Sequence, residues 1–349
     1  MIWLTWRQFR GSAAMTAAVL VVLAAALAVS GPGLADAYAK GIAGCTPDDT
    51  CGRFFDRFFD EYQLPFMAAS LVVLLLPALV GLFWGAPLIT RELETGTHLM
   101  VWNQTITRTR WLTVKLGLVG LAAVAAAGLC GLLVTWWSTP LDNSAAEGYA
   151  LMDPLVFTAR GIAPMGYAAF AFVLGVTVGM LVRRLLPAMA LTLALFAVVQ
   201  LAMPLLVRAH LMTPVTATFE LGPPNVDGIG IPRDGARSPE VTLSAAVPGH
   251  AGAWVLESVL LDPSGRVIAE TGRQGVINVS STSGPCAPTG PSAGEACMAE
   301  INRLGYRQQA TYHPLDRFWP FQWIETGIYA LLTIALTGFC FWWLRRRLS

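Results

Sequence analysis

The sequence predicts an all-α polytopic membrane protein with six transmembrane helices and a small β-rich extracytoplasmic domain between the fifth helix and the sixth. Two observations predict the helices: 55% of the residues are hydrophobic and only 13% are charged, where soluble domains carry roughly 25% charged residues. The third observation is a change of composition to Pro, Gly, Ser and Thr over residues 213–316. We therefore expect a membrane domain at 1–207, the β-rich domain at 208–318, and a sixth span with an Arg-rich tail at 319–349.

The apolar runs are long enough to cross a hydrocarbon core, which takes about 20 helical residues. Inside lipid the backbone N–H and C=O groups must be hydrogen-bonded within the protein, so only helices and closed β-barrels cross a membrane. Runs that do not alternate between apolar and polar residues are therefore helices rather than barrel strands. The expected spans are residues 11–30, 66–89, 112–137, 161–182, 185–207 and 319–344.

The distribution of charge orients these spans. Basic residues accumulate on the cytoplasmic side of membrane proteins. The expected outside loop 138–159 has no Lys or Arg but contains Asp142, Glu147 and Asp153. The segments assigned to the inside contain Arg7, Arg10, Arg91, Arg108, Arg110, Lys115, Arg183, Arg184, Arg345, Arg346 and Arg347. Both termini are therefore expected in the cytoplasm.

Four cysteines fall in the expected outside loops, Cys45 and Cys51 in the first and Cys286 and Cys297 in the last. Even numbers in oxidising segments are typical of disulfides. Pairing within each loop encloses fewer residues than pairing between the two loops, so it costs less conformational entropy. The connectivity stays open, as does the alternative of four unpaired thiols.

Within the first outside loop, residues 31–65, four phenylalanines recur with helical spacing: Phe54, Phe55, Phe58 and Phe59. This pattern predicts a short amphipathic helix, which either packs against the protein or forms a lateral gate for an amphiphilic substrate. Residues 1–10 form either an interfacial elbow helix or simply the start of the first span.

The outer insertion contains three apolar stretches typical of strands, at residues 241–247, 253–261 and 266–271. Between the last two, the sequence Asp262-Pro-Ser-Gly265 favours a turn, because Pro presets φ and Gly accepts the strained position. We expect a small β-rich domain closed by a Cys286–Cys297 disulfide.

Enzyme activity has little support in the residues. A P-loop needs Gly-Lys-Ser/Thr, and the two lysines, Lys40 and Lys115, follow Ala39 and Val114. The four histidines are scattered and show no metal-ligand spacing. We expect no catalytic residue, metal site, cofactor or nucleic-acid partner in this chain.

The most informative segment runs from residue 85 to residue 117. Its ordered pattern is Arg91-Glu92-x-Glu94-x-Gly96-Thr97, followed by a basic stretch with Trp102 and Trp111. This segment resembles the first cytoplasmic loop of type-2 ABC exporter permeases, and the stretch from Asp316 to Glu325 also resembles that family. The long outer insertion departs from the short segment found in many relatives.

The resemblance implies that residues 88–111 form a coupling loop docked on a separate ABC ATPase subunit, which binds ATP and Mg. It also implies a bacterial plasma membrane protein of actinobacterial type in a 2+2 assembly. The second permease would be another copy of this chain or a paralogous one.

The residues of the loop fit that role. Thr90 or Thr95 can cap a short surface helix, Glu92 and Glu94 would present charge to the ATPase, and Arg91 would position the loop. Gly96 and Thr97 would make the turn, since Gly accepts a tight bend. The alternative is an ordinary basic cytoplasmic loop whose acids only balance nearby arginines.

Glu325 is the one acid expected inside a span. A carboxylate at the centre of a helix costs about 2.5–3.5 kcal/mol on insertion scales, so Glu325 should face a wet cavity or a partner such as Arg317 or Arg208. It either lines the translocation path, with Gln200 and Tyr329, or forms a structural pair.

Two G-x-x-x-G motifs, residues 81–85 and 175–179, permit close helix approach and are candidates for the subunit interface. The function favoured by these features is export of a hydrophobic or amphiphilic compound. The alternative is a membrane sensor or scaffold whose outer domain binds a ligand or peptide.

Overall fold

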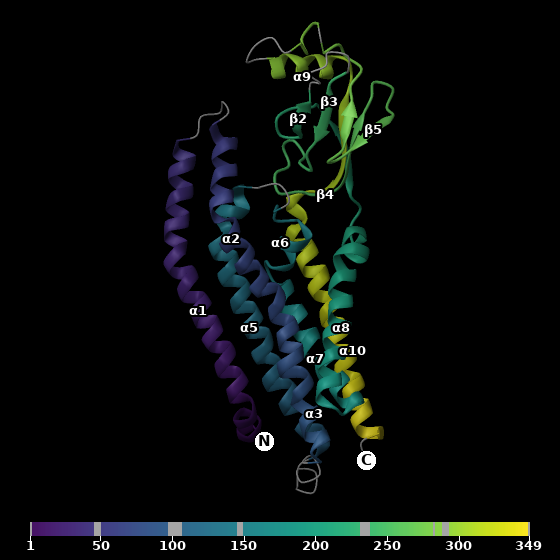
Figure 1. Ribbon diagram of the computed structural model, residues 1–349. Helices are drawn as coiled ribbons and strands as arrows, with labels where there is room; N and C mark the ends of the chain where they lie inside the picture. The colour runs from purple at the N-terminus through teal and green to yellow at the C-terminus, as the bar shows by residue number, and fades with distance from the viewer. Residues whose placement is uncertain are drawn as a thin grey trace. The chain divides into compact units, whose positions relative to one another are not determined.

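The computed structural model describes residues 2–44, 50–96, 107–144, 149–230, 238–281, 283–287 and 293–347. The chain divides into two compact units (Figure 1). The membrane unit comprises residues 1–144, 155–211 and 319–349, and the β unit comprises residues 145–154 and 212–318.

Long helices build the membrane unit. The α-helices that the structure describes in this unit are α1 (Ile2–Ala43), α2 (Thr50–Val80), α3 (Ala86–Glu94), α5 (Arg108–Ser144), α6 (Pro154–Thr158), α7 (Ala163–Val182), α8 (Leu185–Ala202) and α10 (Phe318–Arg347). Within the described residues, six segments are long and apolar enough to cross a membrane: Phe9–Ala43, Arg57–Glu94, Arg108–Ser144, Ala163–Val182, Leu185–His210 and Leu315–Arg346. The six expected spans are thus confirmed.

The first two spans extend well beyond their expected ends. α1 continues to Ala43 with Pro32 inside it, and α2 begins at Thr50 with Pro65 inside it. The segment 31–65 is therefore largely helical rather than a loop. Residues 2–10 belong to α1 itself, so no separate elbow helix precedes it. Cys45 and the side chain of Cys51 lie outside the described residues, so their expected pairing stays a prediction.

The phenylalanine stripe packs α2 against α1. The ring of Tyr38 on α1 lies 5.6 Å from that of Phe58 and 6.4 Å from that of Phe54. Phe58 and Phe59 are buried. Of the two roles that the stripe allows, the structure supports helix packing.

A π-helical turn, η1 (Gly81–Gly85), joins α2 to α3, so the second span runs on without a break in the helix. Its glycines lie against α7. A Cβ on Gly81 would stand 2.8 Å from the Ala171 carbonyl oxygen, and one on Gly175 would stand 2.7 Å from the Ala86 nitrogen. Only glycine permits this backbone approach. The two G-x-x-x-G motifs therefore meet each other within one chain, which corrects their assignment to a subunit interface.

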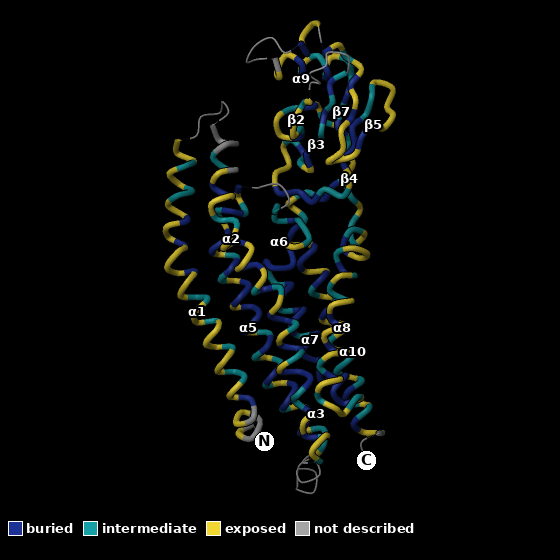
Figure 2. Tube along the Cα trace, viewed as in Figure 1, coloured by how far each residue is buried: buried dark blue, intermediate teal, exposed yellow. Residues whose placement is uncertain are grey.

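α7 is the most enclosed span, and its trace is dark along nearly its whole length in Figure 2. It anchors an apolar core shared with α8 and α10, whose buried members are Ala163, Tyr167, Phe170, Ala171, Leu174, Val178, Ala188, Phe196, Met203 and Tyr329. The membrane unit is thus organised around this helix, with both chain ends at one end of the unit (Figure 1). We name this the terminus end, and the other the opposite end.

The β unit contains two antiparallel sheets. The four-stranded sheet has the order β1-β7-β4-β5 and the three-stranded sheet the order β2-β3-β6. The strands are β1 (Val215–Phe219), β2 (Val226–Gly230), β3 (Glu240–Leu243), β4 (Trp254–Leu261), β5 (Val267–Glu270), β6 (Gln274–Val276) and β7 (Arg307–His313). The three expected strands correspond to β3, β4 and β5, and the expected turn joins β4 to β5.

The Cys286–Cys297 disulfide is present and fully buried. It fixes helix α9 (Ala293–Arg303) to the rest of the β unit, where both sulfurs join a core with Val241, Leu260 and Ile301. This confirms the predicted bridge. The four strands outside the expected stretches and helix α9 were not anticipated.

Candidate functional site

In the part of the chain that the structure describes, three buried ion pairs join separate segments of the membrane unit. They are Lys115–Glu92, Arg160–Asp142 and Arg208–Glu325. Ionisable side chains at membrane depth are costly, so they are rare and are candidates for functional sites. The first pair lies toward the terminus end and the other two lie toward the opposite end.

At the terminus end, Lys115 on α5 holds the last turns of α3. Its Nζ lies 2.6 Å from Glu92 Oε1 and donates a second hydrogen bond to the Leu88 carbonyl oxygen at 3.2 Å. The ammonium also lies over the Trp111 ring, 4.8 Å from its centre. The Lys115 and Glu92 side chains are 2% and 11% exposed, so the pair is an internal link between the second span and the third.

The residues expected to contact an ATPase separate into two groups. Arg91 and Glu94 are exposed, whereas Glu92 is buried and forms an ion pair with Lys115. This corrects the expectation that both acids lie at the surface. Glu94 Oε2 accepts a hydrogen bond from the Leu185 backbone N–H at 3.3 Å, at the start of α8. Gly96 has a φ of +72°, as a helix-ending turn requires, and Thr97 lies outside the described residues.

The threonines do not cap a separate surface helix. Thr90 Oγ1 donates to the Ala86 carbonyl at 2.6 Å, and Thr95 Oγ1 donates to the Arg91 carbonyl at 2.8 Å. Both bonds return to the preceding turn of the same helix. The described first part of the 88–111 segment is therefore the end of the second span, and residues 97–106 lie outside the described residues.

At the opposite end, Glu325 on α10 is fully buried and has three donors. Arg208 forms two hydrogen bonds with it, Nε to Oε2 at 2.7 Å and Nη2 to Oε1 at 2.9 Å. Tyr167 on α7 donates its hydroxyl to Oε1 at 2.5 Å. The Arg208 guanidinium also lies over the Phe157 ring at 4.2 Å. Of the two partners considered for Glu325, the structure selects Arg208.

Gln200 and Tyr329, the other residues expected on a path, join this cluster. The Tyr329 hydroxyl donates to Gln200 Oε1 at 3.2 Å, and its ring meets that of Tyr167 edge to face, with ring centres 4.7 Å apart. The structure thus brings Gln200, Glu325 and Tyr329 together on α8 and α10. Glu325 and Tyr329 are enclosed by protein in this conformation, each 0% exposed.

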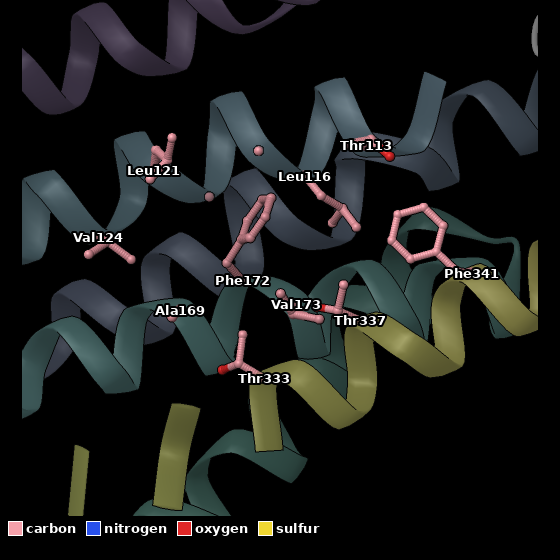
Figure 3. A pocket seen from close by; sticks show the side chains of 12 residues that line it. Thr113, Leu116, Leu121, Val124, Ala169, Phe172, Val173, Thr333, Thr337 and Phe341 are labelled. Carbon is pink, nitrogen blue, oxygen red and sulfur yellow. The ribbon is translucent and has the colours of Figure 1, made fainter. Parts of the chain in front are cut away.

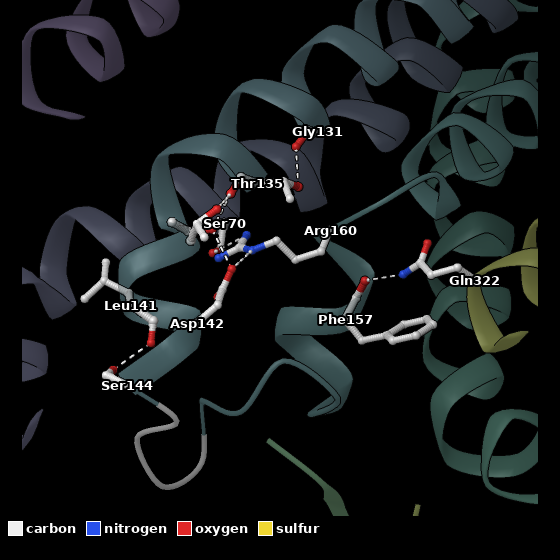
Figure 4. Close-up of polar contacts among 11 residues, drawn as sticks. Ser70, Gly131, Thr135, Leu141, Asp142, Ser144, Phe157, Arg160 and Gln322 are labelled. Carbon is white, nitrogen blue, oxygen red and sulfur yellow. Dashed lines mark hydrogen bonds and ion pairs between the residues drawn. The ribbon is translucent and has the colours of Figure 1, made fainter. Parts of the chain in front are cut away.

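A neighbouring network joins α2, α5, α7 and α10 (Figure 4). Arg160 donates from Nε to Asp142 at 3.3 Å and from Nη1 to Ser70 at 3.3 Å. Gln322 on α10 accepts hydrogen bonds from the backbone N–H groups of residues 162 and 163 and donates to the Phe157 carbonyl. The segment before α7 is therefore held by polar side chains from three other helices.

Several of these residues were not anticipated as members of a site: Lys115, Asp142, Arg160, Tyr167 and Gln322. For Lys115 a signal exists, because it lies inside the expected third span at residues 112–137, where a charge needs a partner. Asp142 and Arg160 lie in and next to the expected outside loop, so nothing in their spacing indicates burial. Tyr167 and Gln322 carry no charge and give no signal of this kind.

The comparison with known families decides the identity of the membrane unit. A family model described as ABC-2 membrane transporter related matches residues 17–208. The chain belongs to this family. No curated protein and no solved structure matches it.

Membership of the ABC-2 membrane transporter related family makes this a multi-pass membrane protein and indicates an ABC transporter permease. The family also implies a partner ATPase. The matched residues include the Lys115–Glu92 and Arg160–Asp142 pairs and end at Arg208. The β unit and α10, with Glu325, lie beyond the match. Among the described residues, no group of His, Cys, Asp and Glu could hold a metal ion.

Proposed function

We propose that this chain is the transmembrane subunit of an ABC exporter, driven by ATP hydrolysis on a separate ATPase subunit that docks at the 88–111 segment. ATP and Mg bind to that partner. Both chain ends and the docking segment lie in the cytoplasm of a bacterial cell, because the basic residues concentrate there. The β unit lies outside the plasma membrane, where its disulfide is stable.

The observation that carries this proposal is how the end of the second span is fixed. α3 is bound to α5 through Glu92 and Lys115, to α8 through Glu94 and the Leu185 N–H, and to α7 through the glycine contacts. A displacement of α3 by a partner bound to the exposed Arg91 and Glu94 side chains would therefore be transmitted to three other spans at once. Contiguous packed elements of this kind can carry coupling between two sites.

The proposed assembly contains two permeases and two ATPases. Its second permease is another copy of this chain or a paralogue, and its substrate is hydrophobic or amphiphilic, in keeping with the apolar spans. Glu325, Gln200 and Tyr329 are its candidate path residues, and the Tyr329–Gln200 and Arg208–Glu325 contacts would have to separate when the opposite end opens.

The first test is co-purification of the full chain from its native membrane in mild detergent. The proposal requires a stoichiometric partner whose sequence contains a P-loop. A kinase or a regulator in its place would favour a sensor whose outer unit binds a ligand, and would overturn the transport proposal.

The second test separates docking from folding at the 88–111 segment. Arg91→Gln and Glu94→Gln each remove one exposed charge, and Glu94→Gln retains an acceptor for the Leu185 N–H. We expect both variants to reach the membrane and to bind less ATPase than the unaltered chain. Glu270→Gln, an exposed acid on β5, is the matched control and should bind the same amount. Unchanged ATPase binding by both loop variants would argue against docking at this segment.

A further inference from the structure

An open groove runs along the membrane unit between α5, α7 and α10 (Figure 3). Its volume is about 380 Å³, within the roughly 300–1,000 Å³ of ligand pockets. Ala169, Phe172 and Val173 of α7 form the floor, and α5 and α10 form the two walls.

The groove is apolar in practice, although threonines line it. Thr113 donates its hydroxyl to the Thr109 carbonyl at 2.9 Å, and Thr333 donates to the Tyr329 carbonyl at 2.7 Å. Two of the three lining threonines therefore have hydroxyls that are satisfied within their own helices, and Thr337 is the third. The remaining lining is chiefly aliphatic and aromatic, and Leu121 on the rim is 73% exposed.

The length of the groove along α5 matches one leaflet. Along α5 it extends from Thr113 to Val124, which at 1.5 Å per residue is about 16 Å. Half of a hydrocarbon core of about 30 Å is about 15 Å. Because α5 begins at Arg108 and α10 ends at Arg347, the groove lies in the half of the unit next to the terminus end.

A basic hollow adjoins the groove at that end. It is lined by Trp342, Arg345 and Arg346 and shares Phe341 with the groove. Both arginines are exposed, and neither forms an ion pair with a described residue. The Arg346 guanidinium lies over the Trp342 ring at 5.7 Å. Tryptophan and arginine together are typical of the headgroup layer.

We propose that this groove binds one acyl chain of an anionic phospholipid from the adjacent leaflet and that Arg345 and Arg346 bind its phosphate headgroup. Basic pockets beside transmembrane helices recognise anionic headgroups in this way. The arrangement places an apolar slot next to two cations that form no ion pair with a described residue. It does not depend on the transport proposal.

The charges disfavour a second copy of the chain as the occupant. A symmetric dimer brings the same patch of both subunits together, so it would place the Arg345 and Arg346 side chains of one copy near those of the other. Like charges brought together across an interface are unfavourable. An anionic lipid instead neutralises them.

Native mass spectrometry of the full chain, released from detergent with added phosphatidylglycerol or phosphatidylcholine, tests the proposal. We expect phosphatidylglycerol to be retained in preference to phosphatidylcholine. The double variant Arg345→Gln/Arg346→Gln should lose roughly 20- to 30-fold in apparent affinity for phosphatidylglycerol, from the attraction of two arginines to anionic lipid. Arg183→Gln/Arg184→Gln, a basic pair outside the groove, is the matched control and should retain it.

A second variant fills the slot without touching the charges. A Cβ on Gly117 would meet nothing within 4 Å, so Gly117→Leu should fold normally and displace the acyl chain. Gly11→Leu on α1, where a Cβ is equally unobstructed, should retain the lipid. Equal retention of the two lipids, or full retention by Gly117→Leu, would overturn the proposal. So would a change from dimer to monomer mass in Gly117→Leu, because the groove would then be a subunit contact.

Discussion

The Lys115 ammonium on α5 lies 2.6 Å from the Glu92 carboxylate on α3, across 23 residues of sequence. These two residues flank the segment that joins the second span to the third, so their contact closes the base of that segment. Glu92 was expected to meet a partner protein, but in the structure it fixes the segment to the bundle. Arg91 and Glu94 are exposed, and the docking proposal therefore rests on these two residues.

Removing one member of this pair should destabilise the membrane unit. Lys115→Met or Glu92→Met leaves an uncompensated charge among buried groups, which costs about 3–5 kcal/mol. The double variant should recover most of that loss, because apolar replacement of a buried pair is often neutral. Denaturant unfolding of the purified proteins in detergent measures the stability of the two single variants and of the double variant. Single variants that unfold like the unaltered chain would show that the pair contributes nothing.

The spans could be predicted because length and apolarity alone define them, whereas the contacts between spans could not. Gly81, Gly85, Gly175 and Gly179 were recognised as close-approach residues, but a glycine spacing does not say which helix faces it. The same holds for Glu325: its place inside a span predicts either a wet cavity or a cationic partner, and only the fold selects Arg208. The ends of α1 and α2 were missed because Pro32 and Pro65 favour a break that the helices do not make.

The glycine contacts between η1 and α7 give a second prediction. Gly175→Ala places a Cβ against the backbone of residues 81–86. Backbone atoms cannot rotate away, so the helices must separate, and overpacking of this kind costs about 1–3 kcal/mol. Gly327→Ala on α10, where a Cβ meets nothing within 4 Å, is the control. Thermal unfolding of both variants in detergent should show a lower midpoint for Gly175→Ala alone, and equal midpoints would contradict the close packing.

The Arg208–Glu325 pair leads to a third prediction. Glu325→Gln leaves Arg208, which is 0% exposed, without its counter-charge, so we expect a loss of about 3–5 kcal/mol. Arg208→Gln/Glu325→Gln removes both charges and should be more stable than either single variant. Denaturant unfolding in detergent completes this double-mutant cycle. If Glu325 instead faced water in the resting state, Glu325→Gln would be nearly neutral and the cycle would show no coupling.

The turn between β4 and β5 predicts a response to acid. Hydrogen bonds to the Asp262 carboxylate, from the Ser264 hydroxyl first and then from the Arg266 backbone N–H, lower the pKa of Asp262 from 3.8 to about 2. Because the folded pKa is depressed, the stabilisation is present above pH 3.8 and is lost as the pH falls toward 2. Protonation removes the charge that these donors share, so the turn should open across that range.

Pepsin, which is active in acid, can measure this opening in the full chain. Cleavage next to Leu260 and Leu261 should rise between pH 4 and pH 2 in the unaltered protein. In Asp262→Asn the same bonds should be already weakened, and cleavage should be higher at pH 4 and change less with pH. Asp227→Asn, at an exposed acid on β2, controls for the pH dependence of the protease. Parallel cleavage profiles for Asp262→Asn and Asp227→Asn would show that the Asp262 charge does not hold the turn.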